Sequence, residues 1–208
     1  MKNTTLIAIL FSFLFINFKS EGNNVILNYS SLTSGITYGQ DYLGLDGEDY
    51  TSLGISFSSD FLTKGVIGVG ITNTWIDDLD MNLMKIGLGI GSIYKIRENL
   101  HLVANIQFDH YQSNDSGHDI EGWGVVPRLD LRYAFNNKYQ IGIFLEYSDL
   151  FDVDVNSNSG ALSLSIDDGF GYGINQVIAL SESLGLGTGI LFNENGFDNV
   201  YLSIELHY

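Results

Sequence analysis

The middle of the chain holds the residues best suited to nucleophilic chemistry. His110 and Ser113 belong to the run His110-Tyr111-Gln112-Ser113-Asn114, and a serine acts as a nucleophile when an imidazole base lies within hydrogen-bond reach of its hydroxyl. The residues before this run alternate between apolar and polar types, as they do in a β-strand. In a strand, His110 and Ser113 point to opposite faces unless a bulge intervenes. The spacing therefore argues against a serine triad.

Acidic pairs are a second candidate for catalysis or metal binding. Asp77 and Asp78 are adjacent, and Asp109 precedes His110, but an acid-rich chain offers such pairs by chance. The run 152–158 begins like a calcium loop yet lacks the glycine at its sixth position and the acidic residue at its twelfth, so we interpret it as a solvated acidic loop. No metal-ligand spacing links the other histidines, His101, His118 and His207. We expect no metal site and no cofactor.

The elements that position these residues are strands. The last residues alternate between apolar Leu202, Ile204, Leu206 and Tyr208 and more polar neighbours, a period of two that indicates a strand with one apolar face. The first strand lies within roughly residues 25–39, where the apolar parity switches between Tyr29 and Leu32 and predicts a bulge or a late start. The other alternating segments are 53–57, 67–75, 84–96, 100–108, 123–135, 139–147, 170–180, 184–192 and 200–208.

The connections between these segments alternate in length. Short ones lie at 60–65, 97–99, 136–138 and 181–183, and longer ones at 39–49, 76–82, 112–122, 149–168 and 193–198. Short turns on one rim, long loops on the other and an even number of strands are typical of a closed, antiparallel transmembrane β-barrel. We predict an all-β barrel of ten strands, with eight as the alternative. Both termini then lie on the short-turn, periplasmic side.

The amino-terminal residues resemble a secretory signal. Lys2 precedes an apolar run over residues 6–16, which is too short for a membrane-spanning helix. We expect cleavage after Gly22, or alternatively after Ser20, with an uncleaved anchor as the other interpretation. Residues 1–22 are then a cleaved signal peptide and residues 23–208 one barrel domain. The chain has no cysteine, which excludes disulfides and amino-terminal lipidation.

Aromatic residues gather near the ends of the predicted strands. In a membrane barrel such residues form the girdles at the two interfaces. We therefore expect a structural rather than a ligand-stacking role for Trp75, Tyr94, Tyr111, Trp123, Tyr133, Tyr139, Tyr147 and Tyr208.

Charge is distributed unevenly between the two rims. The net charge is −16, and the long connections contain no Lys or Arg. Such a rim repels nucleic acid and attracts divalent cations, which also bridge lipopolysaccharide phosphates. The predicted outer acidic loops include Asp46, Glu48, Asp49, Asp77, Asp78, Asp80, Asp152, Asp154, Asp167 and Asp168.

Charged residues also lie on the polar faces of the strands, which point into the lumen. A turn centred on residue 137 places Arg128 directly opposite Glu146, and a looser diagonal pairs Lys85 with Asp109. Arg132 and Asp130 share the same face. Charges in a narrow lumen need partners, and large groups on one wall can fill the space beside glycines on the other. We predict lumen salt bridges and a plugged or narrowly wet interior.

The signal-like start, the alternating strands and the terminal run 200–208 resemble the small porin-like bacterial outer-membrane β-barrel family, including the OmpX-like and OmpA-type barrels. The resemblance is architectural and covers essentially the whole mature chain. It implies the outer membrane of a Gram-negative bacterium, and it implies that Leu202, Ile204, Leu206 and Tyr208 form the signal read by the barrel-assembly machinery.

Two enzyme groups within such barrels also bear comparison. Omptin-like proteases use an Asp pair and a His–Asp pair, and PagL-type lipid A deacylases use a His-Tyr-Ser-Asn stretch that here contains one inserted residue.

These observations favour a monomeric structural or surface-interaction barrel that is not an enzyme. Its expected neighbours are outer-membrane lipid, lipopolysaccharide and divalent cations at the outer loops, and we expect no nucleic acid. A narrow cation-preferring pore is the first alternative, and a lipid A-modifying enzyme is the second.

Overall fold

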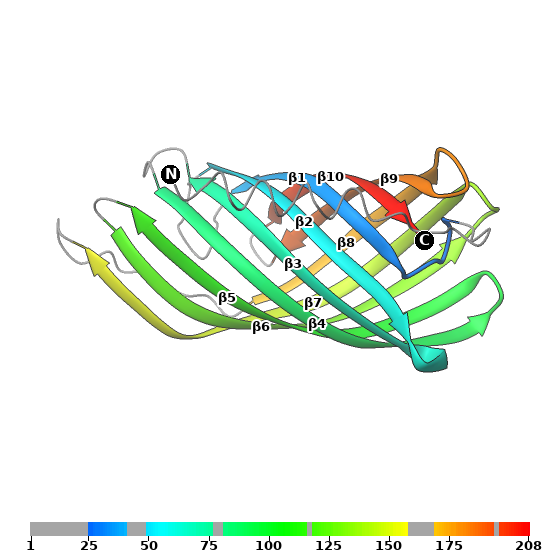
Figure 1. The fold of residues 1–208 in the computed structure, drawn as a ribbon, viewed down its shortest axis with the longest axis horizontal. Coiled ribbons are helices and arrows are strands. Elements are labelled where there is room, and N and C mark those ends of the chain that lie inside the picture. Colours follow the sequence, from blue (N-terminus) through cyan, green and yellow to red (C-terminus); the bar gives the residue numbers. More distant parts are fainter. Residues whose placement is uncertain (1–24, 41–48, 77–80, 116–117, 158–168, 194–195) are drawn as a thin grey trace.

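A computed structural model of the chain describes residues 25–40, 49–76, 81–115, 118–157, 169–193 and 196–208. These residues form one closed ring of antiparallel strands (Figure 1). Among them, no helix is long and apolar enough to cross a membrane. The strands are β1 (Ser31–Gln40), β2 (Asp49–Phe61), β3 (Gly65–Ile76), β4 (Met81–Arg97), β5 (Leu100–Asp115), β6 (His118–Ala134), β7 (Tyr139–Ser157), β8 (Gly169–Ala179), β9 (Leu184–Asn193) and β10 (Gly196–His207).

Each strand pairs with its neighbours in sequence, and β1 pairs with β10 to close the ring. The closing ladder runs from Ser31 opposite His207 to Gly39 opposite Asn199. The predicted ten-stranded closed barrel is therefore confirmed, and the eight-stranded alternative is wrong. Closure pairs the main-chain amide and carbonyl groups that an open sheet would leave free at its edges.

Side chains alternate between the outer surface and the lumen. On β4, Ile86, Leu88 and Ile90 are 44%, 55% and 51% exposed, while Gly87 and Gly89 between them face the interior. Thirty or so large apolar side chains are exposed in this way, which in water would be costly at about 25 cal/mol per Å² of apolar surface. An outer face of this kind suits a hydrocarbon solvent.

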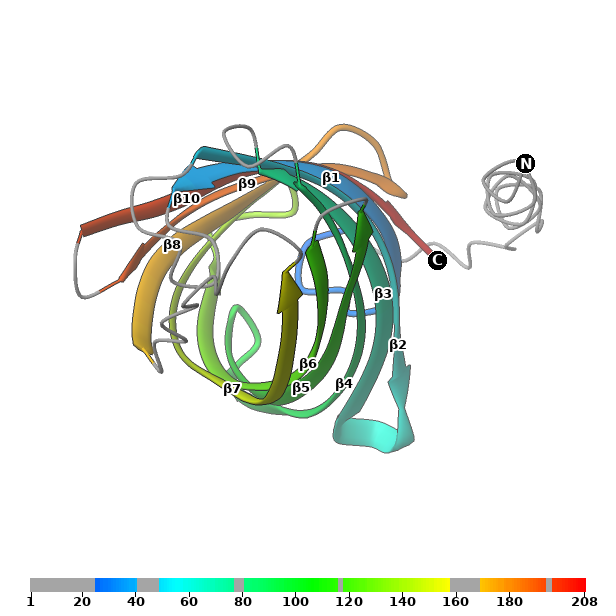
Figure 2. The same ribbon diagram turned by 90° about the vertical axis from the view of Figure 1, so that its left-hand side faces the viewer.

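The two rims of the barrel differ. One rim, here called the turn rim, carries the short turns between β2 and β3, β4 and β5, β6 and β7, and β8 and β9, together with the carboxyl terminus at the right of Figure 1. The other rim, the loop rim, carries the remaining connections. Figure 2 looks along the barrel from the loop rim and shows the strands surrounding a central lumen.

Several predicted loops prove shorter than the sequence suggested. The segment 112–122 is mostly a projecting hairpin, because β5 continues to Asp115 and pairs there with His118 of β6. β7 likewise continues through 149–157, so only 158–168 remains between it and β8. Main-chain pairing continues beyond the apolar band although the side chains there have become acidic. Figure 1 shows these strands extending past their neighbours on the left.

The predicted late start of the first strand is also present. β1 begins at Ser31, and the preceding residues form a turn in which the amide of Asn28 donates to the carbonyl of Val25. Tyr29 is buried, whereas Ile36 and Tyr38 on β1 are 47% and 45% exposed on the outside. The parity switch therefore marks the point where the chain leaves the lumen and joins the wall.

Candidate functional site

The candidate site is the lumen, and its middle holds a group of charged side chains. Arg128 on β6 is the direct cross-strand partner of Glu146 on β7. Arg128 Nη1 lies 3.2 Å from Glu146 Oε2, and their side chains are 25% and 15% exposed. Both residues point inward, in the register expected from the turn at residue 137. The Arg128 guanidinium also stacks on Phe144, with Cζ 3.6 Å from the ring centroid.

Asp130 links a second arginine to this pair. Its Oδ2 lies 2.9 Å from Arg132 Nη2 and 3.6 Å from Arg128 Nη2, and it accepts a hydrogen bond of 3.2 Å from Asn175 Nδ2 on β8. Asp130 is only 1% exposed. A buried carboxylate is costly unless it is paired, so the two arginines and Asn175 account for its presence. We call Arg128, Asp130, Arg132 and Glu146 the ion-pair belt.

Lys85 and Asp109 form a separate diagonal pair. Lys85 Nζ lies 3.6 Å from Asp109 Oδ2, while Gln107 Nε2 donates to Asp109 Oδ1 at 2.7 Å. Tyr111 donates its hydroxyl proton to Asp109 Oδ2 at 3.4 Å. A Cβ atom added to Gly87 would lie 2.5 Å from Asp109 Oδ1, so this glycine makes room for the carboxylate.

A chamber remains beside these charged groups. It has a volume of about 440 Å³, and its wall from β2 to β4 presents mostly small residues, including Gly54, Ser56, Gly68, Gly70, Thr72 and Gly89. The larger polar residues that line it are Lys85, Asn105, Gln107, Tyr201 and Glu205. Large groups therefore occupy only part of the space beside the glycines. Glu205 is held by His207, whose Nε2 lies 3.1 Å from Glu205 Oε2.

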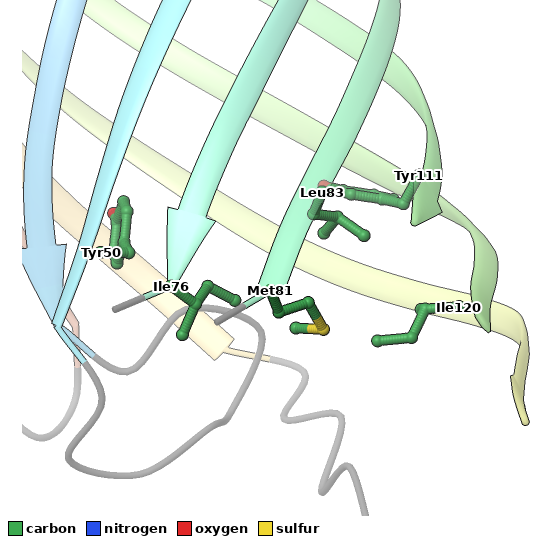
Figure 3. Close-up of a cluster of buried hydrophobic side chains, with 6 residues drawn as sticks. All are labelled: Tyr50, Ile76, Met81, Leu83, Tyr111 and Ile120. Carbon is green, nitrogen blue, oxygen red and sulfur yellow. The ribbon is translucent and has the colours of Figure 1, made fainter. Parts of the chain in front are cut away.

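An apolar cluster lies inside the barrel toward the loop rim (Figure 3). We call it the loop-rim cluster; Leu150 packs against it, and its members are Tyr50, Ile76, Met81, Leu83, Tyr111 and Ile120. Tyr111 is 7% exposed, so the prediction that it belongs to the outer girdle is wrong. Tyr111 directly follows His110 on β5, and successive side chains of a strand point to opposite faces. Because His110 points outward, Tyr111 points into the lumen. Because Leu83 has the same strand parity as Lys85, parity alone could have revealed this cluster.

The structure does not bring the catalytic candidates together. His110 points outward, where its ring lies 4.4 Å from that of Trp123 and its Nε2 lies 3.3 Å from Glu121 Oε1. Ser113 is 1% exposed and lies on the opposite face of β5. Asp109 points into the lumen, and Asp77 and Asp78 lie outside the described residues. The base His110 and the nucleophile Ser113 therefore lie on opposite faces of β5, as the strand spacing predicts.

Among the predicted girdle residues, Trp75, Tyr94, Trp123 and Tyr133 are exposed on the outer surface, and Tyr139 and Tyr147 are partly exposed. The terminal strand presents Leu202, Ile204 and Leu206 outward. Tyr208 stacks on Phe57 at 5.6 Å and donates its hydroxyl proton to the Ser58 carbonyl at 2.6 Å. These contacts fix the last residue against β2.

The predicted acidic loops are only partly described. Asp49 begins β2 and accepts hydrogen bonds from Tyr38 Oη and Gln40 Nε2, each 2.9 Å long. Asp152 and Asp154 lie in β7. Outside the described residues are Asp46, Glu48, Asp77, Asp78, Asp80, Asp167 and Asp168.

Comparisons with known proteins identify similar barrels but no family. No protein-family model and no curated protein matches the chain. An outer membrane channel from Pseudomonas putida F1 is 9% identical, covers 91% of this chain and 99% of its own, and has a TM-score of 0.49. The KdgM porin in complex with disordered oligogalacturonate is 10% identical, with coverages of 86% and 99% and a TM-score of 0.46. The outer membrane protein Omp33 of Acinetobacter baumannii is 9% identical, with coverages of 88% and 99% and a TM-score of 0.42. None of these three is named as an OmpX-like or OmpA-type barrel.

Proposed function

We propose that this protein is an outer-membrane β-barrel with a lumen closed to larger solutes and a structural or surface-interaction role. The ion-pair belt carries this proposal. Asp130 is almost completely buried between Arg128 and Arg132, and Glu146 holds Arg128 from the adjacent strand. Side chains tied together in this way occupy the lumen rather than line an open channel.

The loop-rim cluster supports the same conclusion. Its members are buried to between 0% and 7% exposure inside the barrel mouth, and apolar groups in a narrow passage exclude water and hydrated ions. A solute entering from the loop rim would meet this cluster before it reached the chamber. The cluster and the belt therefore form two successive barriers.

The orientation in the membrane follows from the two rims. We place the turn rim in the periplasm and the loop rim outside the cell, as in barrels with short periplasmic turns. The acidic residues of the loop rim then face the lipopolysaccharide layer, where divalent cations bridge carboxylates and phosphates. Monomeric insertion through the barrel-assembly machinery, with the 200–208 strand as its signal, completes the proposal.

A narrow cation-preferring pore is the second candidate, and the chamber favours it. A space of about 440 Å³ next to the glycine-rich wall is large enough for water, whose share of liquid volume is about 30 Å³ per molecule. Glu205 and Lys85 both line it. Such a pore would conduct only if the loop-rim cluster and the ion-pair belt left a continuous path.

Planar-bilayer conductance of the refolded protein separates these candidates. We expect rare, small openings or none. Large, stable openings like those of general porins would refute the closed lumen, whereas small, discrete openings with cation preference would favour the second candidate. A refolded general porin in the same bilayer serves as the positive control.

A further inference from the structure

The residues that precede β1 lie inside the barrel at the turn rim. Figure 2 shows this segment, the bluest part of the described chain, within the ring of strands. Val25, Ile26 and Tyr29 are 2%, 6% and 7% exposed. The segment has no regular main-chain pairing, so side chains that line the lumen, rather than a β-ladder, provide the contacts that bury it.

Tyr29 is the principal anchor of the segment. Its hydroxyl oxygen lies 2.9 Å from His101 Nδ1 on β5, a buried hydrogen bond. Its side chain packs with Ile93 and Val103, and Val66 packs against the same group, which we call the turn-rim cluster. Burial raises the pKa of Tyr29 to about 12, so the phenol stays neutral within the cluster at any physiological pH.

Other contacts tie the segment to strands on several sides of the ring. The Leu27 amide donates to Gln140 Oε1 on β7 at 3.0 Å, and Ser58 Oγ on β2 donates to the Tyr29 carbonyl at 2.8 Å. A Cβ atom on Gly185 of β9 would lie 2.8 Å from Val25 Cγ1. The segment thus crosses the mouth from wall to wall instead of following one strand.

The backbone of the segment is held in an unfavourable conformation. Leu27 has φ 58°, in the left-handed region that a leucine rarely adopts unless its surroundings hold it there. Its amide donates to Gln140 Oε1, and Val25 and Tyr29 on either side of it are buried, so contacts on both sides of Leu27 accompany this conformation. A loosely attached tail would relax to an ordinary conformation.

The segment contacts two residues of the chamber wall. Ser58 and Val66 line the chamber and contact Tyr29 or its cluster. Along β4, Leu83 belongs to the loop-rim cluster, Lys85, Gly87 and Gly89 line the chamber, and Ile93 belongs to the turn-rim cluster. The chamber therefore lies between an apolar cluster at each mouth.

We infer that Val25–Ser30 is a plug that closes the turn-rim mouth of the barrel and can be displaced from it without unfolding the wall. This inference rests on the proposed closed lumen, because a plug has a role only if solutes are to be kept out. The plug is linked to the wall mainly by side-chain contacts, whereas the strands are linked by continuous main-chain ladders. Substitutions that weaken the contacts of the plug should therefore open the turn-rim mouth without separating the strands of the barrel.

Cysteine labelling tests the plug directly, because the chain contains no cysteine of its own. One reporter is Val103→Cys, placed in the turn-rim cluster beneath Tyr29, and the other is Ser56→Cys, placed in the chamber. Each is combined with a loosened plug, Val25→Ser with Ile26→Ser and Tyr29→Ala. The matched control is Tyr94→Ala, which removes a tyrosine that is exposed on the outer surface near the same rim.

Refolded protein in micelles is treated with a water-soluble biotin–maleimide, and labelling rates are compared. With the plug intact we expect both reporters to react slowly. Loosening the plug should raise both rates about tenfold, because local opening then no longer limits access. The Tyr94→Ala control should leave both rates unchanged. Heat-modifiable migration in gels confirms that each variant retains its barrel.

Three results would separate the alternatives. Unchanged rates in the loosened variant overturn the plug. Where Ser56→Cys labels slowly with the plug intact, a faster rate at Val103→Cys alone also overturns it, because the segment would then be a strap that does not close the chamber. Fast labelling of Ser56→Cys with an intact plug defeats the proposed closed lumen, and the plug is then decided by Val103→Cys. If the loosened variant does not fold, Tyr29→Ala alone should still accelerate both reporters, and no acceleration overturns the plug.

Discussion

Arg128 and Glu146 face each other across β6 and β7 inside the barrel, with Nη1 3.2 Å from Oε2. The guanidinium also reaches Asp130 and lies over the Phe144 ring. Arg128 therefore has three partners, whereas Glu146, within the described part of the chain, forms a salt bridge with Arg128 alone. The two sides of this pair should respond differently to mutation.

The first prediction is a double-mutant cycle on this pair. Breaking a buried ion pair costs about 3–5 kcal/mol, and less where the pair is partly wet, as here. We expect Arg128→Ala to destabilise the barrel by about 2–4 kcal/mol and Glu146→Ala by less, because removing Arg128 also leaves Asp130 with one arginine fewer. The combined variant should cost clearly less than the sum. Urea unfolding of the protein refolded in lipid vesicles measures all three.

A matched cycle gives the control for this pair. Glu182 lies in the exposed turn between β8 and β9, so Glu182→Ala should add to Arg128→Ala without coupling. If the unfolding free energies lost in Arg128→Ala and Glu146→Ala were also additive, the 3.2 Å contact would contribute nothing to stability.

The second prediction concerns Asp130. Asp130→Asn keeps the size of the side chain but removes the charge that neutralises Arg128 and Arg132. We expect a loss of about 2–3 kcal/mol in unfolding free energy, because Arg128 and Arg132 lose the carboxylate that they share. Glu146 beside Arg128 and Glu205 near Arg132 then compensate the two charges less completely. Glu121→Gln, a carboxylate 62% exposed on the outer surface, is the matched substitution and should change stability by less than about 1 kcal/mol. Equal effects of the two substitutions would contradict a buried belt.

Strand patterning was sufficient to predict the ring and the register of its charged pairs. A period of two fixes which face each side chain occupies, and a short turn fixes which residues lie opposite one another. Arg128 and Glu146 could be paired for this reason, since both lie close to the 136–138 turn. Lys85 and Asp109 lie farther from their turn. The register shift in this ladder lies beside the turn, between Lys95 and Arg97, and pairing is continuous from Lys95 to Leu83, so the diagonal also holds.

The two mouths of the barrel differ in how far strand parity predicts the side chains inside them. Residue type alone predicts that Tyr111 belongs to the outer girdle, whereas its parity on β5 places it in the loop-rim cluster. The Val25–Ser30 segment has no strand pattern at all, so its position depends on contacts to Gln140, His101 and Gly185 that are distant in sequence. Loop lengths were overestimated because acidic composition does not prevent main-chain pairing, as the Asp115 and His118 partners show.

The third prediction concerns lipid A. His110 faces outward and Ser113 is buried on the lumen side, so the His110 imidazole cannot act as the base for the Ser113 hydroxyl. We expect cells expressing the protein to show no deacylated lipid A by mass spectrometry, with an inactive and an active PagL-type deacylase as controls. Loss of an acyl chain that Ser113→Ala abolishes would overturn this expectation and require a rearranged β5.

The fourth prediction compares two glycines that both occupy lumen-facing positions of a strand. A Cβ atom added to Gly173 on β8 would collide with the Ile190 carbonyl and with the Phe144 ring, which itself lies under Arg128. A Cβ atom added to Gly89 on β4 would face the chamber, with its nearest neighbour, the Ile106 carbonyl, 3.8 Å away. The two sites therefore differ in available space rather than in chemistry.

We expect Gly173→Ala to destabilise the barrel by about 1–3 kcal/mol, the usual cost of forcing a methyl group into a filled interior. Gly89→Ala should be neutral or slightly stabilising, because alanine loses less backbone entropy than glycine when it enters a strand. Urea unfolding in lipid vesicles measures both. If Gly89→Ala were the more damaging substitution, the space beside β4 would be filled rather than open, and the chamber would not exist as described. If both were neutral, the packing of Phe144 against β8 would be loose, and the belt that rests on it would not close the lumen.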